Sequence, residues 1–302
     1  MKFLDIYSQD KPILNKIYKD IKKIITKSDF INGQKTREFE EEFAKYCKTK
    51  FAIGCGNGTD ALYIALKSLN LKEGSEVILP AMTWCSTLFS VLQAGLKPVL
   101  VDIEPNSPTI SIDGIRKKIN KRTKAIILVH LYGDCCKFSQ LKRILKNKKV
   151  YIIEDAAQAH GSYEIAGKKK NYVGSFGHLA CFSFYPGKNL GAYGDAGAIV
   201  TNKKKIYNFI QKFHNMGSKF KHEHDIVGIN SRLDSIQAAV LQNKIKKLDR
   251  LNDKRRQLAK LYNKLIDNKN ISKLSYSKGC VFHQYVILSN KPEKFRKYLK
   301  KK

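Results

Sequence analysis

The stretch VYIIEDAAQAHG, residues 150–161, decides how this chain is expected to fold. It begins as an apolar run of strand length and ends in two carboxylates, Glu154 and Asp155. A fully apolar strand is typical of a parallel sheet covered by helices on both faces. Ligand sites in such sheets lie just beyond the carboxyl ends of the strands. Asp155, followed by Gln158 and His160, is therefore a candidate site residue, with a helix cap or a structural ion pair as the alternative.

Similar apolar runs recur on both sides of this stretch, and helical patterns separate several of them. The predicted strands are 51–53, 77–80, 98–103, 125–133, 179–184 and 198–201, and the predicted early helices are 13–26, 37–47 and 59–69. From about residue 231 the pattern becomes one long helical stretch that ends near Asp267, and a β-like run follows at 284–289. Strands that alternate with helices predict an α/β fold with a large, mostly parallel sheet.

Length and composition exclude several classes of protein. The chain has 302 residues and a formal net charge of +31, from 57 Lys and Arg against 26 Asp and Glu. The basic residues are mostly lysines spread along helical stretches, so we interpret them as a solvated surface and expect no nucleic acid partner. No apolar run could span a membrane and no signal peptide is evident, which predicts a cytoplasmic protein without a membrane partner.

The seven cysteines and the histidine pair are interpreted as ordinary residues. The cysteine number is odd and no C-x-x-C spacing occurs, so neither a disulfide framework nor a zinc site is expected. His222 and His224 lie in a charged loop and are more often solvated than metal-binding. We therefore predict no metal site.

A glycine-rich turn, GCGNGTDAL at 54–62, opens one of the predicted helices. The amides of Gly58, Thr59 and Asp60 would lie at a helix N-terminus, which favours an anion such as phosphate. The spacing matches neither the dinucleotide-binding fingerprint nor the Walker loop. An ordinary turn capped by Thr59 or Asp60 is the alternative.

A second glycine-rich segment, FSFYPGKNLGAYGDAGAIVT at 182–201, places Lys188 in a loop directly after a strand. A desolvated lysine has a lowered pKa and can form a Schiff base, although most lysines of this chain are expected to be solvated. Ser183 could donate its hydroxyl to a phosphate. A phosphate-binding turn, an acid such as Asp155 and a lysine such as Lys188 are what pyridoxal 5'-phosphate (PLP) requires. Trp84 could stack on the ring or be an ordinary core or interface aromatic.

At this point the chain resembles the DegT/DnrJ/EryC1/StrS family of sugar-nucleotide aminotransferases. The segments that carry the resemblance are NGTDAL (57–62), PAMTW (80–84), IEDAAQAHG (153–161), FSFYPGKNLGAYGDAGAIVT (182–201) and GINSRLDSIQAAVL (228–241), and it runs from FLDI at 3–6 to about residue 290. It implies the type I PLP aminotransferase fold. It further implies an N-terminal segment (1–30) that packs with the small domain, a large PLP-binding domain (31–235) and a small C-terminal domain (236–302) that is shorter than in the family and expected to be incomplete.

The resemblance also implies roles for individual residues. The expected catalytic residues are the Schiff-base Lys188, Asp155 at the pyridine nitrogen, and His160, which lies near the site by its position in the motif. The expected cofactor-binding residues are Gly58, Thr59 and Ser183 at the phosphate, Trp84 on the ring, Gln158 on the ring hydroxyl side, and Asn230 from the neighbouring subunit of a homodimer with shared sites. Tyr185 is expected to bind substrate.

The activity implied is transfer of an amino group from glutamate to a keto group of a nucleotide-linked 6-deoxy sugar, for amino-sugar and polysaccharide biosynthesis. Tyr185 and the sequence GAYGDAG resemble the 3-keto branch more than the 4-keto branch. The alternatives are a 4-keto enzyme, a truncated PLP-binding protein without activity, and a basic nucleic-acid-binding protein. A cysteine desulfurase is a weaker rival that would have to use Cys280.

Overall fold

The computed structural model describes residues 4–146, 148–220 and 222–301, so Phe3 of the FLDI segment and the first residues of the expected N-terminal segment lie outside the described residues. The centre is a seven-stranded sheet in the order β1-β9-β8-β5-β4-β2-β3. Its strands are β1 (Phe51–Cys55), β2 (Glu76–Pro80), β3 (Lys97–Val101), β4 (Thr123–Val129), β5 (Tyr151–Asp155), β8 (Leu179–Ser183) and β9 (Gly197–Thr201). β9 is antiparallel to both of its neighbours, whereas the other pairs are parallel. The predicted α/β class with a large, mostly parallel sheet is confirmed.

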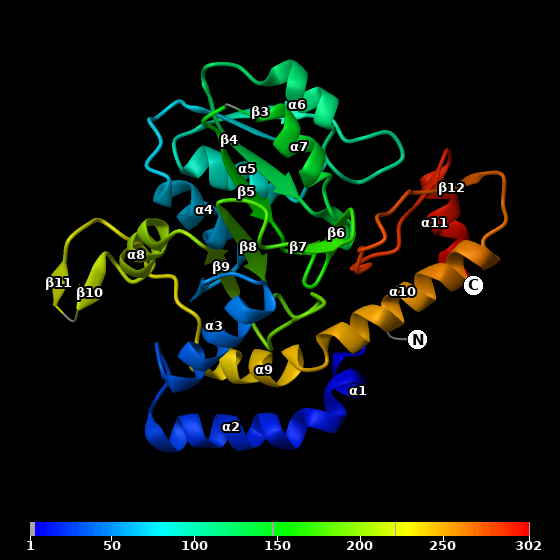
Figure 1. Cartoon of the computed structure of the whole chain (residues 1–302). Helices are drawn as coiled ribbons and strands as arrows, with labels where there is room; N and C mark the ends of the chain where they lie inside the picture. Colours follow the sequence, from blue (N-terminus) through cyan, green and yellow to red (C-terminus); the bar gives the residue numbers. More distant parts are fainter. Residues whose placement is uncertain (1–3, 147, 221, 302) are drawn as a thin grey trace.

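Helices cover both faces of this sheet (Figure 1). Alternate residues of a strand point to opposite faces, and in β4 Ile127 packs into one apolar cluster while Ile126 packs into another. On one face lie α4 (Gly58–Ser68), α5 (Cys85–Gln93) and α8 (Lys204–Phe213). On the other lie α3 (Gln34–Tyr46), α6 (Ile112–Lys118), α7 (Phe138–Ile144) and α9 (Ser235–Ile245). This double cover explains why the central strands read as apolar runs.

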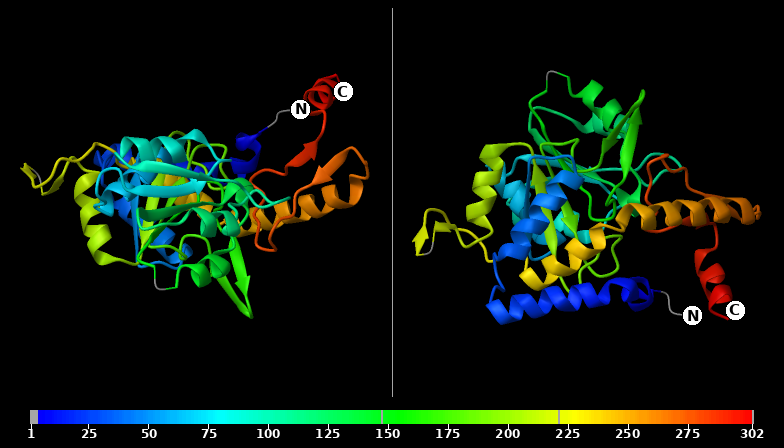
Figure 2. Two further views of the ribbon diagram at one scale, coloured as in Figure 1. Left: turned by 90° about the horizontal axis from the view of Figure 1, so that it is seen from above. Right: turned by 60° about the horizontal axis from the view of Figure 1, so that its bottom comes forward.

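The N-terminal segment lies along α9 (Figure 2). It consists of α1 (Ile6–Asp10), a short 3-10 turn (Lys11–Ile13) and α2 (Leu14–Lys27). Ile13 and Ile17 pack on Val240, and the amine of Lys244 lies 2.8 Å from a carboxylate oxygen of Asp10. Both charged groups of that pair are buried, so it fixes the segment against α9.

The single long helix expected between 231 and about 267 is wrong. The chain forms two helices, α9 and α10 (Leu248–Leu265), which are separated at Lys246 and Lys247. Neither glycine nor proline marks the break, and the apolar pattern continues through it, so the sequence alone gave no signal. α9 contributes to the apolar cluster on the sheet, and Leu248 at the start of α10 is the last residue along the chain in that cluster. Ala259, Cys280 and Val281 are buried farther along the chain. The division into domains stays a prediction.

The remaining elements are small. They are a 3-10 turn (Leu131–Gly133), the hairpins β6 (Tyr163–Ala166) with β7 (Lys169–Tyr172) and β10 (Ser218–Phe220) with β11 (Glu223–His224), and the C-terminal β12 (Ile271–Lys273), β13 (Ile287–Ser289) and α11 (Pro292–Lys300). The β10–β11 hairpin projects from the body of the molecule (Figures 1 and 2). Among the described residues, none of the helices is both apolar enough and long enough to cross a bilayer.

Candidate active site

The predicted phosphate-binding turn lies beside Ser183. α4 begins at Gly58, and the side chain of Asn57 caps it by accepting a hydrogen bond from the Asp60 amide at 2.8 Å. The alternative interpretation, a turn capped by Thr59 or Asp60, therefore names the wrong capping residue. A methyl group added at Gly58 would lie 2.6 Å from Cβ of Ser183, so only glycine allows this approach. The amide end of a helix and a serine hydroxyl together form a site suited to phosphate.

Asp155 ends β5 and is almost completely buried, with 6% of its surface exposed. The hydroxyl of Thr87 donates to its Oδ2 at 2.8 Å, and the amide of Ala157 donates to its Oδ1 at 3.3 Å. Burial raises the pKa of this carboxyl, while these hydrogen bonds and the charge of Lys188 oppose the rise. A second positive group beside Asp155 would stabilise the carboxylate further.

Lys188 lies in the loop between β8 and β9, partly buried and within electrostatic range of Asp155. Its amide donates to the carbonyl of Tyr185 at 2.8 Å, and the amide of Ala192 donates to the carbonyl of Phe184 at 2.7 Å, so backbone bonds hold the loop. Burial lowers the pKa of the Lys188 amine, and Asp155 opposes that shift. An amine with a lowered pKa is available as a nucleophile and a base.

Thr59, Gln158 and Trp84 belong to segments that adjoin these residues: Thr59 follows Gly58 in α4, Gln158 follows Asp155 by three residues, and Trp84 precedes Thr87 by three residues. The hydroxyl of Thr59 donates to Ser86 at 2.8 Å, which joins the phosphate-binding turn to α5. The carboxamide oxygen of Gln158 accepts from the amide of Tyr132 at 2.6 Å, which fixes the direction of this side chain. Trp84 is the N-cap residue of α5, and 71% of its surface is exposed, so the core interpretation of this tryptophan is wrong.

Tyr185 and Asn230 are exposed, as Trp84 is, and we call these three residues the open side of the candidate site. Tyr185 is 59% exposed, and Asn230 is exposed beside the β10–β11 hairpin. The next residue, Ser231, is buried, and its hydroxyl accepts from the Gly56 amide and donates to Asp60. This anchors the Asn230 segment to the phosphate-binding turn of its own chain. The predicted contact of Asn230 with a neighbouring subunit stays a prediction.

His160 is buried beneath the lysine loop. Its ring packs against Phe182 and Phe184, with centroids 5.4 and 5.6 Å away. The backbone of Ser183 lies near the ring, but within the described part of the chain neither ring nitrogen has a partner at hydrogen-bond geometry. Burial, reinforced by Lys188 and His283, lowers the pKa of His160 to about 3, so the imidazole is neutral. The contacts describe a packing role, and the expected catalytic role stays a prediction.

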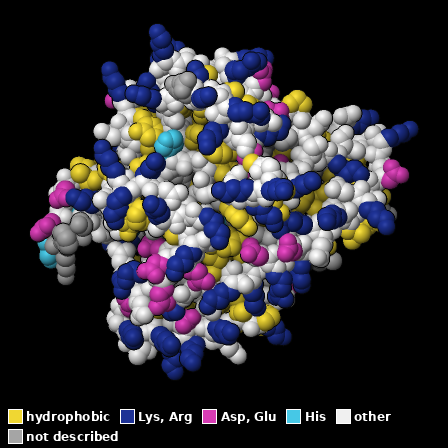
Figure 3. All heavy atoms as spheres, in the orientation of Figure 1, with side chains coloured by type: hydrophobic (Ala, Val, Ile, Leu, Met, Phe, Trp, Pro, Cys, Tyr) yellow, Lys and Arg dark blue, Asp and Glu magenta, His cyan; other side chains and the backbone are white. Residues whose placement is uncertain are grey.

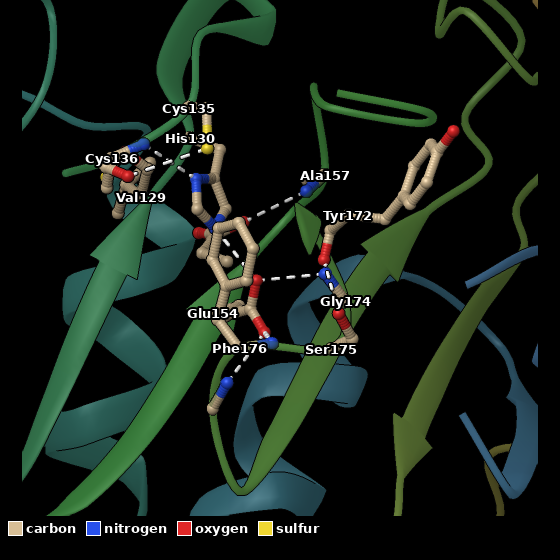
Figure 4. Close-up of polar contacts among 12 residues, drawn as sticks. Val129, His130, Cys135, Cys136, Glu154, Ala157, Tyr172, Gly174, Ser175 and Phe176 are labelled. Atoms are coloured by element: carbon tan, nitrogen blue, oxygen red, sulfur yellow. Dashed lines mark hydrogen bonds and ion pairs between the residues drawn. The ribbon is translucent and has the colours of Figure 1, made fainter. Parts of the chain in front are cut away.

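A buried network around Glu154 supports the floor of the site (Figure 4). Glu154 accepts hydrogen bonds from the amides of Gly174, Phe176 and Gly177 at 2.8–2.9 Å and contacts Nε2 of His130 at 3.1 Å. The amide of Cys136 donates to Nδ1 of that histidine at 3.1 Å, so Nδ1 is the acceptor and the proton on Nε2 points at Glu154. The network therefore fixes the carboxyl ends of β4 and β5, next to Asp155.

Sequence reasoning missed these supporting residues. Glu154 was noted only as the neighbour of Asp155, and a strand that is buried on both faces does imply that its acid needs partners. Thr87 gave no signal, because a threonine in the first turn of a helix is common. The rival thiol, Cys280, is fully buried, and burial raises its pKa, which does not suit a reactive cysteine.

The family model of the "DegT/DnrJ/EryC1/StrS aminotransferase family" matches residues 12–302. The chain belongs to this family. A UDP-N-acetyl-3-dehydro-alpha-D-glucosamine 3-aminotransferase from Acidithiobacillus ferrooxidans is 38% identical over 95% of this chain and 77% of its own length. A dTDP-3-amino-3,6-dideoxy-alpha-D-galactopyranose transaminase from Aneurinibacillus thermoaerophilus is 38% identical over 98% and 81%.

A solved structure extends the similarity to three dimensions. The S. venezuelae protein DesV, solved in complex with a ketimine intermediate, superposes with a TM-score of 0.93 at 34% identity, over 99% of this chain and 80% of DesV. The chain is thus a PLP-dependent aminotransferase with the fold of this family, as predicted. The residues present fit the cofactor: the amide end of α4 at Gly58 and the Ser183 hydroxyl are suited to an anion, Asp155 provides a buried acid, and Lys188 provides a partly desolvated amine.

Proposed function

We propose that this chain transfers an amino group from glutamate to the keto group of a nucleotide-linked 6-deoxy sugar, with the 3-keto position favoured. The product would serve amino-sugar and polysaccharide biosynthesis in the cytoplasm. The observation that carries the proposal is the approach of the Lys188 amine to the buried Asp155 carboxylate, beside the amide end of α4.

The reaction uses these residues in separate roles. PLP, when bound, supplies an electron sink and a carbonyl that carries the amino group between donor and acceptor. Gly58, Thr59 and Ser183 would hold its phosphate, and Asp155 would keep the ring nitrogen protonated. The amine of Lys188, with its lowered pKa, takes a proton from the α-carbon of the amino donor and delivers it to the carbon that receives the amino group.

The choice of sugar rests on sequence and on the relatives. Tyr185 and GAYGDAG occupy the positions that distinguish the 3-keto branch, and both relatives named above carry a 3-amino group in their names. Lys and Arg side chains cover the visible face without gathering into one arm (Figure 3). A positive surface of this kind raises the local concentration of a phosphate-linked sugar.

We further propose a homodimer with shared sites. Several large aromatic and apolar side chains are exposed, among them Trp84 and Phe89 at the start and in the middle of α5 and Val227 after β11. Monomers seldom expose a large apolar patch.

Six of the seven cysteines are buried and all are free, which suits the reducing cytoplasm.

The test is a two-step incubation of the purified holoenzyme. Glutamate alone should convert the bound cofactor to pyridoxamine phosphate, and a 3-keto nucleotide sugar should then restore the original absorption and yield an amino sugar. A panel that includes 4-keto sugars distinguishes the two branches. Failure of glutamate to change the spectrum would instead support a PLP-binding protein without this activity.

A further inference from the structure

The first turn of α5 connects several parts of the site. Trp84 caps the helix, Ser86 accepts the hydroxyl of Thr59, and Thr87 donates to Asp155. The elements that carry Thr59 and Asp155 are separated in sequence by about a third of the chain, so this helix turn sets their relative positions. Thr87 is fully buried and no role has so far been assigned to it.

The hydroxyl bonds of Thr87 have a fixed direction. A carboxylate only accepts hydrogen bonds, so Thr87 uses its single hydrogen toward Oδ2 of Asp155 at 2.8 Å. The hydroxyl of Thr83 lies 2.8 Å from that of Thr87. Since Thr87 has no second hydrogen, Thr83 must be the donor in that contact. The result is a directed chain from Thr83 through Thr87 to Asp155, and chains of this kind strengthen each bond.

These two hydroxyl hydrogen bonds end at a carboxylate that accepts few other hydrogen bonds among the described residues. Oδ1 of Asp155 accepts only the longer bond from Ala157, at 3.3 Å, among the hydrogen bonds of the described residues. The titratable groups that face Asp155 are Lys188 from the loop after β8, His130 after β4 and Cys181 on β8. Lys188 must move when it transfers protons, whereas Thr87 is fixed in a buried helix turn.

We propose that Thr87 is a positioning residue for Asp155. The hydroxyl of Thr87, which accepts a hydrogen bond from Thr83, keeps the Asp155 carboxylate ionised and directed at the cofactor ring nitrogen. The inference rests on the Asp155 part of the proposed function and does not depend on which sugar is the substrate. Removing the hydroxyl should weaken the hold of Asp155 on the ring proton while leaving the phosphate contacts intact.

The experiment compares four holoenzymes: Thr87→Val, Thr87→Ser, Thr83→Val and Thr109→Val. Thr109 is a matched control because it is equally buried and its hydroxyl contacts Ser107 far from the site. Nitrogen NMR of ring-labelled PLP reports protonation of the ring across pH, and stopped-flow absorption gives the rate of conversion by glutamate. Circular dichroism checks the fold of each variant.

The expected results are ordered. Thr87→Val should lose the ring proton at lower pH than the wild type and react about ten- to a hundredfold more slowly, the value of a hydrogen bond to a charged group. Thr83→Val should shift both readouts in the same direction by less, and Thr87→Ser should restore them. Thr109→Val should change neither.

Other outcomes overturn the inference. Ring protonation in Thr87→Val that matches Thr109→Val would show that the hydroxyl does not act on Asp155. If Thr87→Val does not fold, Thr83→Val decides, because an unchanged titration in that variant contradicts the directed chain. Lack of reaction with glutamate in the wild type would contradict the proposed function alone, since the NMR titration needs only the cofactor.

Discussion

The floor and the open side of the site are built differently. On the floor, Asp155 and Glu154 are buried, and each accepts hydrogen bonds from its own chain. On the open side, Trp84 and Tyr185 are 71% and 59% exposed. One chain therefore completes the groups that tune the chemistry, while the groups expected to contact ring, substrate and second subunit face solvent.

The difference follows from the cost of burying polar groups. A carboxylate at the end of a buried strand must be paired within the fold, because leaving it without partners would destabilise the protein. Exposed aromatic side chains destabilise the fold less than an unpaired buried carboxylate does, so they can remain in solvent until a ligand binds. Substitutions on the floor should therefore change stability or chemistry strongly, and substitutions on the open side should change binding without destabilising the chain.

The largest effect is expected for Lys188→Ala. Loss of the group that moves the proton should slow amino transfer by about a hundred- to ten-thousandfold. The visible absorption band of the lysine-linked cofactor should also disappear. Lys205→Ala, which removes an exposed lysine of α8, is the control and should leave rate and spectrum unchanged. An active Lys188→Ala enzyme would contradict the role of the Lys188 amine, and of its pairing with Asp155 on the floor, in the chemistry.

The next effect is on stability, for Glu154→Ala. The change leaves three backbone amides and the Nε2–H of His130 without their acceptor, so the free energy of unfolding should fall by about 3–5 kcal/mol. Urea unfolding of the cofactor-free protein measures it. Glu41→Ala, on an exposed face of α3, should change stability by less than about 0.5 kcal/mol. Equal losses in both variants would contradict the distinction between the two regions.

The sequence predicted the strands and acids of the floor better than the contacts that join distant segments of the chain. Buried strands such as β5 were predicted directly from their apolar runs, and Asp155 and Lys188 were predicted as site residues from their positions at and after the ends of strands. The antiparallel direction of β9, the break at Lys246 and the bond from Thr87 to Asp155 gave no local signal. These features depend on which distant segments meet, and tertiary packing decides that.

A smaller effect is expected at the phosphate-binding turn, between the two regions. Asn57→Ala removes the cap of α4 and should cost about 1 kcal/mol of stability, and it should also weaken PLP binding. Ser111→Ala removes the cap of α6, which is remote from the site, and should cost a similar amount without changing PLP affinity. Thermal unfolding and cofactor titration separate the two. A loss of affinity in both variants would mean that the turn acts only through global stability.

The smallest effect is expected on the open side, for Trp84→Ala. Stacking on the ring is worth about 0.5–1.5 kcal/mol, so PLP affinity should fall by roughly two- to tenfold. The unfolding free energy of the cofactor-free chain should stay within about 0.5 kcal/mol of the wild type, because the side chain is mostly in solvent. Trp84→Phe keeps a ring and should retain most of the affinity. If the alanine variant were destabilised as strongly as Glu154→Ala, Trp84 would have to be part of the packed interior. The residues of the open side would then be fixed by contacts within the chain, as those of the floor are.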